Sequence, residues 1–145
     1  MISIGINGAS GKMGLSLVRL ISESKDLRLV AAIDRADNPS IGKDIGLMAG
    51  LGKPLGVRLS GAMDKKVDVM IDFSQPAGTM KILASCLKYK TALLIGTTGL
   101  STAQKNKIRL AGRKIACLIS PNMSIGANLL FKVAPQIAAI LGKEY

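Results

Sequence analysis

Short runs of almost continuous apolar residues recur along the chain, at residues 2–6, 27–33, 67–71, 91–95 and 115–119. A strand that is apolar on both faces suits a parallel sheet covered by helices, whereas a strand with one exposed face alternates apolar and polar residues. We therefore predict five strands of a mainly parallel sheet at these positions.

Segments with the apolar spacing of helices separate these runs. They begin at Lys12, Pro76, Ser101 and about Ser124, and the first three end near Ser22, Lys88 and Gly112. Alternating strands and helices predict a doubly wound α/β fold with right-handed crossovers and helices on both faces of the sheet. Residues 35–56 interrupt the alternation with five glycines and two prolines. We expect a long connection there, functional or mobile, with at most one short helical turn.

Local signals mark the helix ends. Pro76 stands in a first turn, where proline is tolerated, and Ser101 with Gln104 three residues later forms a capping-box pattern. Gly112 is expected to end its helix in the left-handed conformation. Pro135 is expected to kink or break the last helix, because proline lacks the N–H that a helix interior needs.

The first apolar run leads directly into a turn with glycines at positions 8, 11 and 14, and then into a helix. Gly8 permits the tight turn, Gly11 lets a pyrophosphate approach the backbone, and Gly14 lets the helix pack closely on the strand. The first N–H groups and the positive dipole end of that helix would face the phosphates. Such a turn also occurs without a ligand, but a strand before it and a helix after it favour a dinucleotide cofactor.

The second run ends in Asp34, 20 residues after Gly14, where a carboxylate would contact the ribose hydroxyls. Arg35 follows, and its guanidinium suits a 2′-phosphate. The carboxylate favours NADH, whereas Arg35, with Lys12 as a second cation, favours NADPH. We expect the use of both cofactors, and the preference between them stays open.

Polar segments follow three later strands, at the edge where open α/β sheets bind ligands. Glycines would let the backbone approach a flat ring, hydroxyls could bind it, and amides can donate and accept at once. Each segment alone is also compatible with an ordinary turn or helix cap. The three segments are Asp72-Phe73-Ser74, Gly96-Thr97-Thr98-Gly99 and the stretch from Ser120 to Asn128.

The charge distribution narrows the choice of partner. The formal net charge is +11, and ten basic residues but no acidic residue lie between Phe73 and Lys143. Such a field suits nucleic acid, a phosphorylated cofactor or a small di-acid. Aromatic residues make up 3% of the chain, too few for a base-stacking platform, and the basic residues from 105 to 114 are typical of a solvated helix surface.

Other compositional features exclude whole classes of site. The chain contains no histidine, which argues against a zinc site or a histidine-based catalytic device within it. Cys86 and Cys117 lie in apolar surroundings and are typical of buried, inert thiols. The sequence has neither an apolar stretch long enough for a membrane-spanning helix nor the long apolar core of a signal peptide. We therefore expect no membrane span, no signal peptide and a cytoplasmic location.

Taken together, the motifs resemble the dihydrodipicolinate reductase (4-hydroxy-tetrahydrodipicolinate reductase) family. Gly-Ala-x-Gly-x-Met-Gly, Asp-Phe-Ser, Gly-Thr-Thr-Gly and Asn-Met-Ser-Ile-Gly-x-Asn occur in that family's order over essentially the whole chain. The resemblance implies a Rossmann-like fold and an oxidoreductase. It also implies reduction by NADPH or NADH of 4-hydroxy-tetrahydrodipicolinate to tetrahydrodipicolinate, a step of diaminopimelate and lysine biosynthesis.

The resemblance also implies a role for particular residues. It assigns the pyrophosphate to Gly8, Ala9, Ser10, Gly11, Lys12 and Met13, the adenosine ribose to Asp34 and Arg35, and further cofactor contacts to Phe73 and Ser74. It assigns the nicotinamide half to Gly96, Thr97, Thr98, Ser120, Pro121, Asn122 and Met123, with Thr98 also beside a carboxylate of the small dicarboxylate substrate.

Family members carry a second domain that binds substrate and handles the proton. We therefore expect residues 1–145 to form only the dinucleotide-binding domain, with no catalytic residue, no metal and little or no activity alone. The resemblance implies a homo-oligomer, a tetramer, for the full-length protein. The alternatives are a non-catalytic nucleotide-binding module and a basic nucleic-acid-binding domain.

Overall fold

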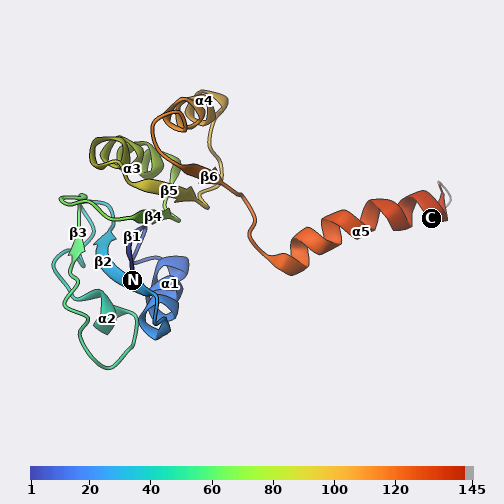
Figure 1. Ribbon diagram of the computed structural model, residues 1–145. Coiled ribbons are helices and arrows are strands. Elements are labelled where there is room, and N and C mark those ends of the chain that lie inside the picture. The colour runs from blue at the N-terminus through green and yellow to red at the C-terminus, as the bar shows by residue number, and fades with distance from the viewer. Residues whose placement is uncertain (143–145) are drawn as a thin grey trace.

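The computed structural model describes residues 1–142, so the last three residues of the predicted domain lie outside the described part. A parallel sheet of six strands in the order β3-β2-β1-β4-β5-β6 forms its centre (Figure 1). The strands are β1 (Ile2–Asn7), β2 (Leu27–Ile33), β3 (Leu59–Ser60), β4 (Val69–Asp72), β5 (Ala92–Ile95) and β6 (Cys117–Ile119). The five predicted strands are confirmed within two residues at either end, and β3 was not predicted.

Two apolar clusters cover the two faces of the sheet. Helices α1 (Lys12–Glu23) and α2 (Ile45–Met48) contribute to one cluster, with Ile6 fully buried beneath them. Helices α3 (Pro76–Tyr89) and α4 (Thr102–Ala111) contribute to the other, around Met70. The predicted α/β class, with helices on both faces, is confirmed.

The connection over residues 35–56 contains one short helical turn, α2, as predicted. Asp44 begins this turn, and its carboxylate accepts hydrogen bonds from the main-chain N–H groups of Gly46, Leu47, Leu55 and Gly56. Ile45 is fully buried in the core. Asp44 therefore holds the connection together internally, whereas the buried side chain of Ile45 and the main-chain hydrogen bonds of Gly42 and Lys43 to Leu59 anchor it to the sheet.

Helix α4 ends at Gly112 as predicted, but the predicted left-handed conformation of this glycine is wrong. Gly112 is right-handed, with φ −60°, because the chain continues turning after α4 and the N–H groups of Arg113 and Lys114 still donate to earlier carbonyls. The left-handed cap belongs instead to Lys90, with φ 55°, at the end of α3. The capping box of Ser101 and Gln104 is confirmed.

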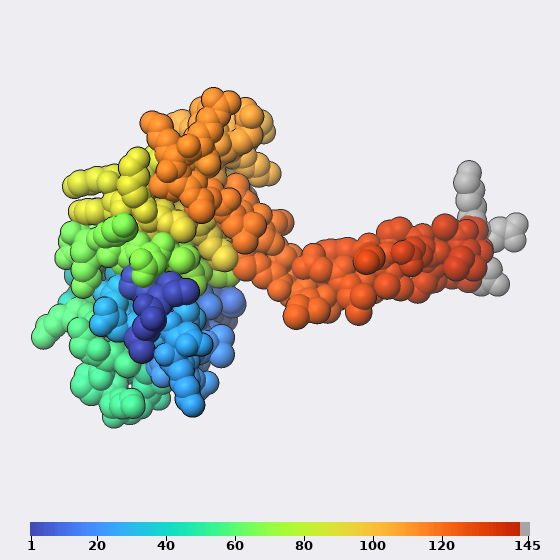
Figure 2. Space-filling model, in the orientation of Figure 1, coloured from blue at the N-terminus to red at the C-terminus, as the bar shows by residue number. Residues whose placement is uncertain are grey.

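Helix α5 (Ile125–Leu141) runs through Pro135, so the predicted break does not occur. Proline leaves the carbonyl four residues earlier without its helical donor, and the exposure of α5 lets water take that place. None of its residues is buried, and it projects from the rest of the molecule (Figures 1 and 2). Within residues 1–142, no helix has the length and apolar character to cross a membrane.

Candidate functional site

The predicted site segments all begin at one edge of the sheet. In the strand register, Asn7 pairs with Ile33 on one side and with Asp72 on the other. Asp72 pairs in turn with Ile95, and Ile95 with Ile119. The residues that follow these five strand ends, namely Gly8, Asp34, Phe73, Gly96 and Ser120, therefore start side by side, as the sequence predicts.

The three glycines of the first turn have different surroundings. Gly8 has φ +78°, and a Cβ there would lie 2.5 Å from the carbonyl oxygen of Phe73. A Cβ on Gly14 would overlap the main chain of Gly8 and Ala9. A Cβ on Gly11 would meet only the Gly8 oxygen, at 3.3 Å, so this side of the turn is open. A ligand can approach the backbone at Gly11, which fits the pyrophosphate of a dinucleotide.

The N-terminus of α1 is left without a side-chain cap. Gly11 is its N-cap residue, and its first turn contains no acidic residue. Helix α3 also lacks a side-chain cap, whereas Asp44, Ser101 and Ser124 accept main-chain hydrogen bonds at the starts of α2, α4 and α5. The first N–H groups of α1 are thus free for an anion, with the helix dipole favouring negative charge.

A cleft of about 470 Å³ opens beside this turn. Seven of the predicted cofactor residues line it: Gly8, Ser10, Gly11, Asp34, Arg35, Phe73 and Ser74. Residues that the sequence reasoning missed also line it, including Gly61, Ala62, Met63 and Lys81. The predicted nicotinamide-side residues Gly96, Thr97, Thr98 and 120–123 do not line this cleft, and neither do Ala9, Lys12 and Met13.

Asp34 joins the end of β2 to the glycine turn. Its Oδ2 accepts hydrogen bonds from the main-chain N–H (3.0 Å) and the hydroxyl (2.6 Å) of Ser10, and its Oδ1 accepts one from the N–H of Arg35 (2.8 Å). Burial raises the pKa of this carboxyl, but these hydrogen bonds outweigh burial, and the net pKa lies below its usual value. The carboxylate at the predicted ribose position is therefore charged and held in place.

Arg35 extends into solvent at the rim of the cleft. Its guanidinium lies 3.5 Å from a carboxylate oxygen of Asp37, and its side chain is 68% exposed. An exposed ion pair of this kind contributes little to stability, so Arg35 can exchange Asp37 for another anion at little cost in free energy.

The hydroxyls of the two neighbouring threonines are used differently. Thr97 is buried, and its Oγ1 accepts a hydrogen bond from the N–H of Ser74 while it donates to Asp72. Thr98 is exposed. Gly96 lies against the ring of Phe73, which a Cβ on Gly96 would overlap.

The segment after β6 is organised by its own polar groups. Ser120 donates from its hydroxyl to the carbonyl of Asn122, and the side-chain oxygen of Asn122 accepts from the N–H of Ser124. Asn128 donates to the carbonyl of Asn122 as well. The predicted alternative, that these residues form a turn and a helix cap, is thus realised at Ser124, which caps α5.

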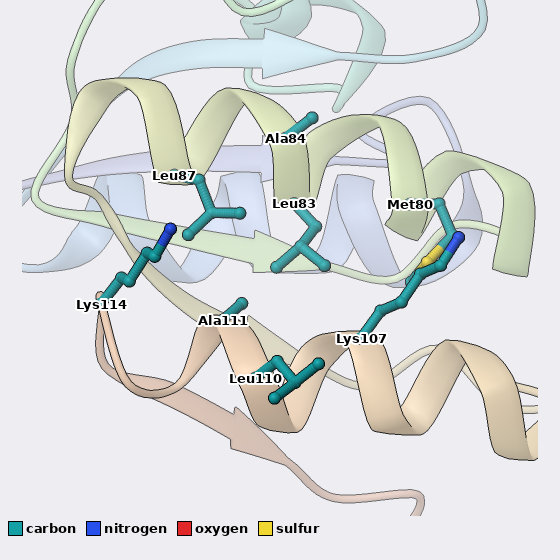
Figure 3. A pocket seen from close by; sticks show the side chains of 8 residues that line it. All are labelled: Met80, Leu83, Ala84, Leu87, Lys107, Leu110, Ala111 and Lys114. Carbon is teal, nitrogen blue, oxygen red and sulfur yellow. The ribbon is translucent and has the colours of Figure 1, made fainter.

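A second hollow of about 370 Å³ lies between α3 and α4 and is shown in Figure 3. Apolar side chains such as Leu83 and Leu110 line it, with Lys107 from α4 and Lys114 from the turn after α4. None of the predicted site residues takes part. The strand-end cleft is therefore the one that agrees with the sequence motifs.

Cys86 is buried in the apolar cluster on the α3 and α4 face, and Cys117 is half-buried against that cluster. Burial, together with neighbouring Cys117 and Asp72, raises the pKa of Cys86 to about 12. Burial also raises the pKa of Cys117. Both thiols are free and protonated near neutral pH, which fits the expectation of inert side chains.

Comparison with known proteins settles the family. A family model for the N-terminus of dihydrodipicolinate reductase matches residues 2–123. The chain belongs to this family. The 4-hydroxy-tetrahydrodipicolinate reductase of Bordetella pertussis is 40% identical over 144 residues, covering 98% of this chain and 53% of that protein. The enzyme of the same name from Nitrosomonas europaea is 39% identical over 147 residues, covering 99% and 54%.

Solved structures agree with this family. The dipicolinate-bound dihydrodipicolinate reductase of Paenisporosarcina sp. TG-14 matches with a TM-score of 0.73 and 28% identity, covering 96% of this chain and 54% of that one. An aspartate semialdehyde dehydrogenase from Candida albicans, at 15% identity and a TM-score of 0.58, shares the fold alone. The chain spans about half the length of the dihydrodipicolinate reductases that it matches.

Proposed function

We propose that this chain is the nicotinamide-dinucleotide-binding half of a 4-hydroxy-tetrahydrodipicolinate reductase and that it accepts both NADPH and NADH. The observation that carries the proposal is the cleft at the strand ends. The glycine turn, whose backbone is open at Gly11, lines one part of this cleft, and Asp34 and Arg35 line another part. The turn suits the pyrophosphate, and the two charged residues suit the adenosine ribose.

Asp34 retains capacity for a ribose hydroxyl. It accepts three hydrogen bonds within the protein, whereas a carboxylate has about four acceptor sites. NADH would use the remaining site. With NADPH, the 2′-phosphate would meet the negative charge of Asp34, and Arg35 would offset that repulsion by leaving Asp37 for the phosphate. Use of both cofactors follows from this pair of residues.

The nicotinamide half of the cofactor would lie over the segments 96–98 and 120–123, beyond the edge of the cleft. The bound cofactor supplies a hydride to the substrate. Thr98 is exposed and takes part in no hydrogen bond that the described residues make, so its hydroxyl can contact a carboxylate of the dicarboxylate substrate. The part of this chain is to bind and orient the cofactor, and we expect little or no turnover from these 145 residues alone.

Substitution of Gly11 by valine tests the site. The side chain would occupy the open approach to the backbone, so we expect the dissociation constants of NADPH and NADH to rise at least about tenfold. Cofactor fluorescence measures both constants, and circular dichroism checks the fold. Gly126→Val is the matched control, because a Cβ at Gly126 meets nothing closer than 4.0 Å and the residue lies in α5. Unchanged binding by a folded Gly11→Val variant would contradict the proposal.

Substitution of Arg35 by alanine tests the cofactor preference. Loss of a charge-assisted hydrogen bond to phosphate raises the dissociation constant of NADPH about ten- to a hundredfold, whereas that of NADH changes little. Arg113→Ala, which removes an exposed cation beyond the end of α4, is the control for net charge. Equal changes for the two cofactors would remove Arg35 from this role.

A further inference from the structure

Asp72, the last residue of β4, is a fully buried carboxylate directly behind the proposed site. It accepts four hydrogen bonds, from Asn7 Nδ2 (2.7 Å), Ser74 Oγ (2.5 Å), Thr79 Oγ1 (2.5 Å) and Thr97 Oγ1 (3.0 Å). The donors come from the end of β1, the loop after β4, helix α3 and the loop after β5. One side chain thus joins four segments, and the donor farthest from it along the chain, Asn7, is 65 residues away.

These four hydrogen bonds are the only compensation that the described residues give the charge. No lysine or arginine of residues 1–142 forms an ion pair with Asp72. Burial of a carboxylate is costly unless it is fully hydrogen-bonded, and four bonds use about all of its acceptor sites. Any movement of a donor would leave the carboxylate incompletely bonded, so the donors are fixed relative to one another.

The network extends from the carboxylate into the proposed binding loops. The hydroxyl of Thr97 donates to Asp72 and accepts from the N–H of Ser74 at 3.0 Å. Asn7, which precedes Gly8, also donates to the hydroxyl of Ser74 at 3.0 Å. Thr97 stands between two residues of the proposed nicotinamide loop. The orientation of that loop therefore depends on Asp72.

The glycine turn, by contrast, is held from its other side. The N–H groups of Gly8 and Ala9 both donate to the carbonyl of Ile33, at 2.9 and 3.0 Å. Ser10 is bound to Asp34. These contacts to β2 do not involve Asp72, so the glycine turn would remain bound to β2 after loss of the Asp72 charge.

We propose that Asp72 is a positioning residue for the nicotinamide half of the cofactor. It fixes the loop of residues 96–98 against the segment 73–74 and the end of β1, and it does so through the hydroxyl of Thr97 and without touching the cofactor. This inference rests on the proposed function, since it assigns the nicotinamide to the loop that Asp72 holds.

The test compares a complete cofactor with its adenosine half on the 145-residue chain. Asp72→Asn keeps the shape of the side chain but removes an acceptor oxygen and the charge. We expect the dissociation constant of NADPH to rise about tenfold and that of 2′,5′-ADP to change less than about twofold. The emission of bound NADPH should also shift toward that of the free cofactor, because it reports on the surroundings of the nicotinamide ring.

A second pair of variants keeps the test decisive if Asp72→Asn does not fold. Thr97→Val removes the bridging hydroxyl at nearly constant volume and should give the same split, and Thr97→Ser should restore NADPH binding. Thr91→Val is the matched control, because Thr91 is fully buried and donates its hydroxyl to the carbonyl of Val67. It should lower stability and leave the ratio of the two dissociation constants unchanged.

Two results would overturn the inference. One is a folded Asp72→Asn or Thr97→Val variant that binds NADPH as tightly as the unmodified chain. The other is an equal loss of NADPH and 2′,5′-ADP affinity, which would show a general structural role. If the unmodified chain bound neither ligand, the proposed function itself would fail, and the inference with it.

Discussion

The body of the molecule, from β1 to β6 with α1 to α4, and the helix α5 use apolar residues in opposite ways. In the body, apolar side chains form two clusters, and residues such as Ile6 and Ile95 are fully buried. In α5, large apolar side chains face solvent over the whole length, with Ile125 87% and Ile140 84% exposed. Figure 2 shows the helix projecting from the compact body.

The described residues bury the apolar side chains of the body but leave those of α5 exposed. The body buries one apolar cluster on each face of the sheet. An exposed apolar surface as long as α5 marks an interaction site, and an isolated helix of 17 residues is only marginally stable in water. No part of residues 1–142 covers α5. We therefore expect the stability of the body to be independent of this helix.

Matched substitutions of two isoleucines should show the largest difference between the body and α5. Ile6→Ala opens a cavity in the body and should lower the free energy of unfolding by about 2–5 kcal/mol. Ile140→Ala deletes the same atoms from an exposed site and should change it by less than about 0.5 kcal/mol. Urea unfolding at low protein concentration measures both values. A loss of similar size for Ile140→Ala would mean that α5 belongs to the folded core.

The loss of stability in acid should also differ between the body and α5, by less than the effect of Ile6→Ala. The folded-state pKa of Asp34 is lowered, so its stabilisation is present above about pH 4 and is lost as the pH falls through that folded-state value. Ser10→Ala removes the hydrogen bond that lowers the pKa of Asp34 most. The free energy of unfolding of this variant should therefore fall less steeply with decreasing pH than that of the unmodified chain. Residues 125–142 contain no carboxylate side chain, so α5 should add nothing to it. An identical acid profile for Ser10→Ala would contradict the assignment.

Most of the fold was predictable because buried parallel strands leave continuous apolar runs in the sequence. Strand β3 was missed because it has only two residues, Leu59 and Ser60, and so leaves no run. The left-handed conformation predicted for Gly112 and the helix break predicted at Pro135 were wrong for another reason. Glycine permits a left-handed cap without requiring one, and proline is tolerated in a helix whose freed carbonyl faces water.

The juxtaposition of the predicted site segments was predictable because parallel strands end at a common edge. The wall formed by Gly61, Ala62 and Met63 was not predictable, since it depends on the unpredicted strand β3. The role of Asp72 was not predictable either. Its four donors come from separate segments, and only the three-dimensional structure brings them to one carboxylate.

We conclude that residues 1–124, which comprise the body and the segment after β6, form the cofactor site without α5, and titration with NADPH checks this conclusion. The measurement compares the 145-residue chain with a chain that lacks residues 125–145. Both should bind NADPH with dissociation constants that agree within about twofold, because every residue proposed to contact the cofactor precedes α5. Saturable binding by the 145-residue chain and none by the shortened, folded one would contradict the account and would make α5 part of the site.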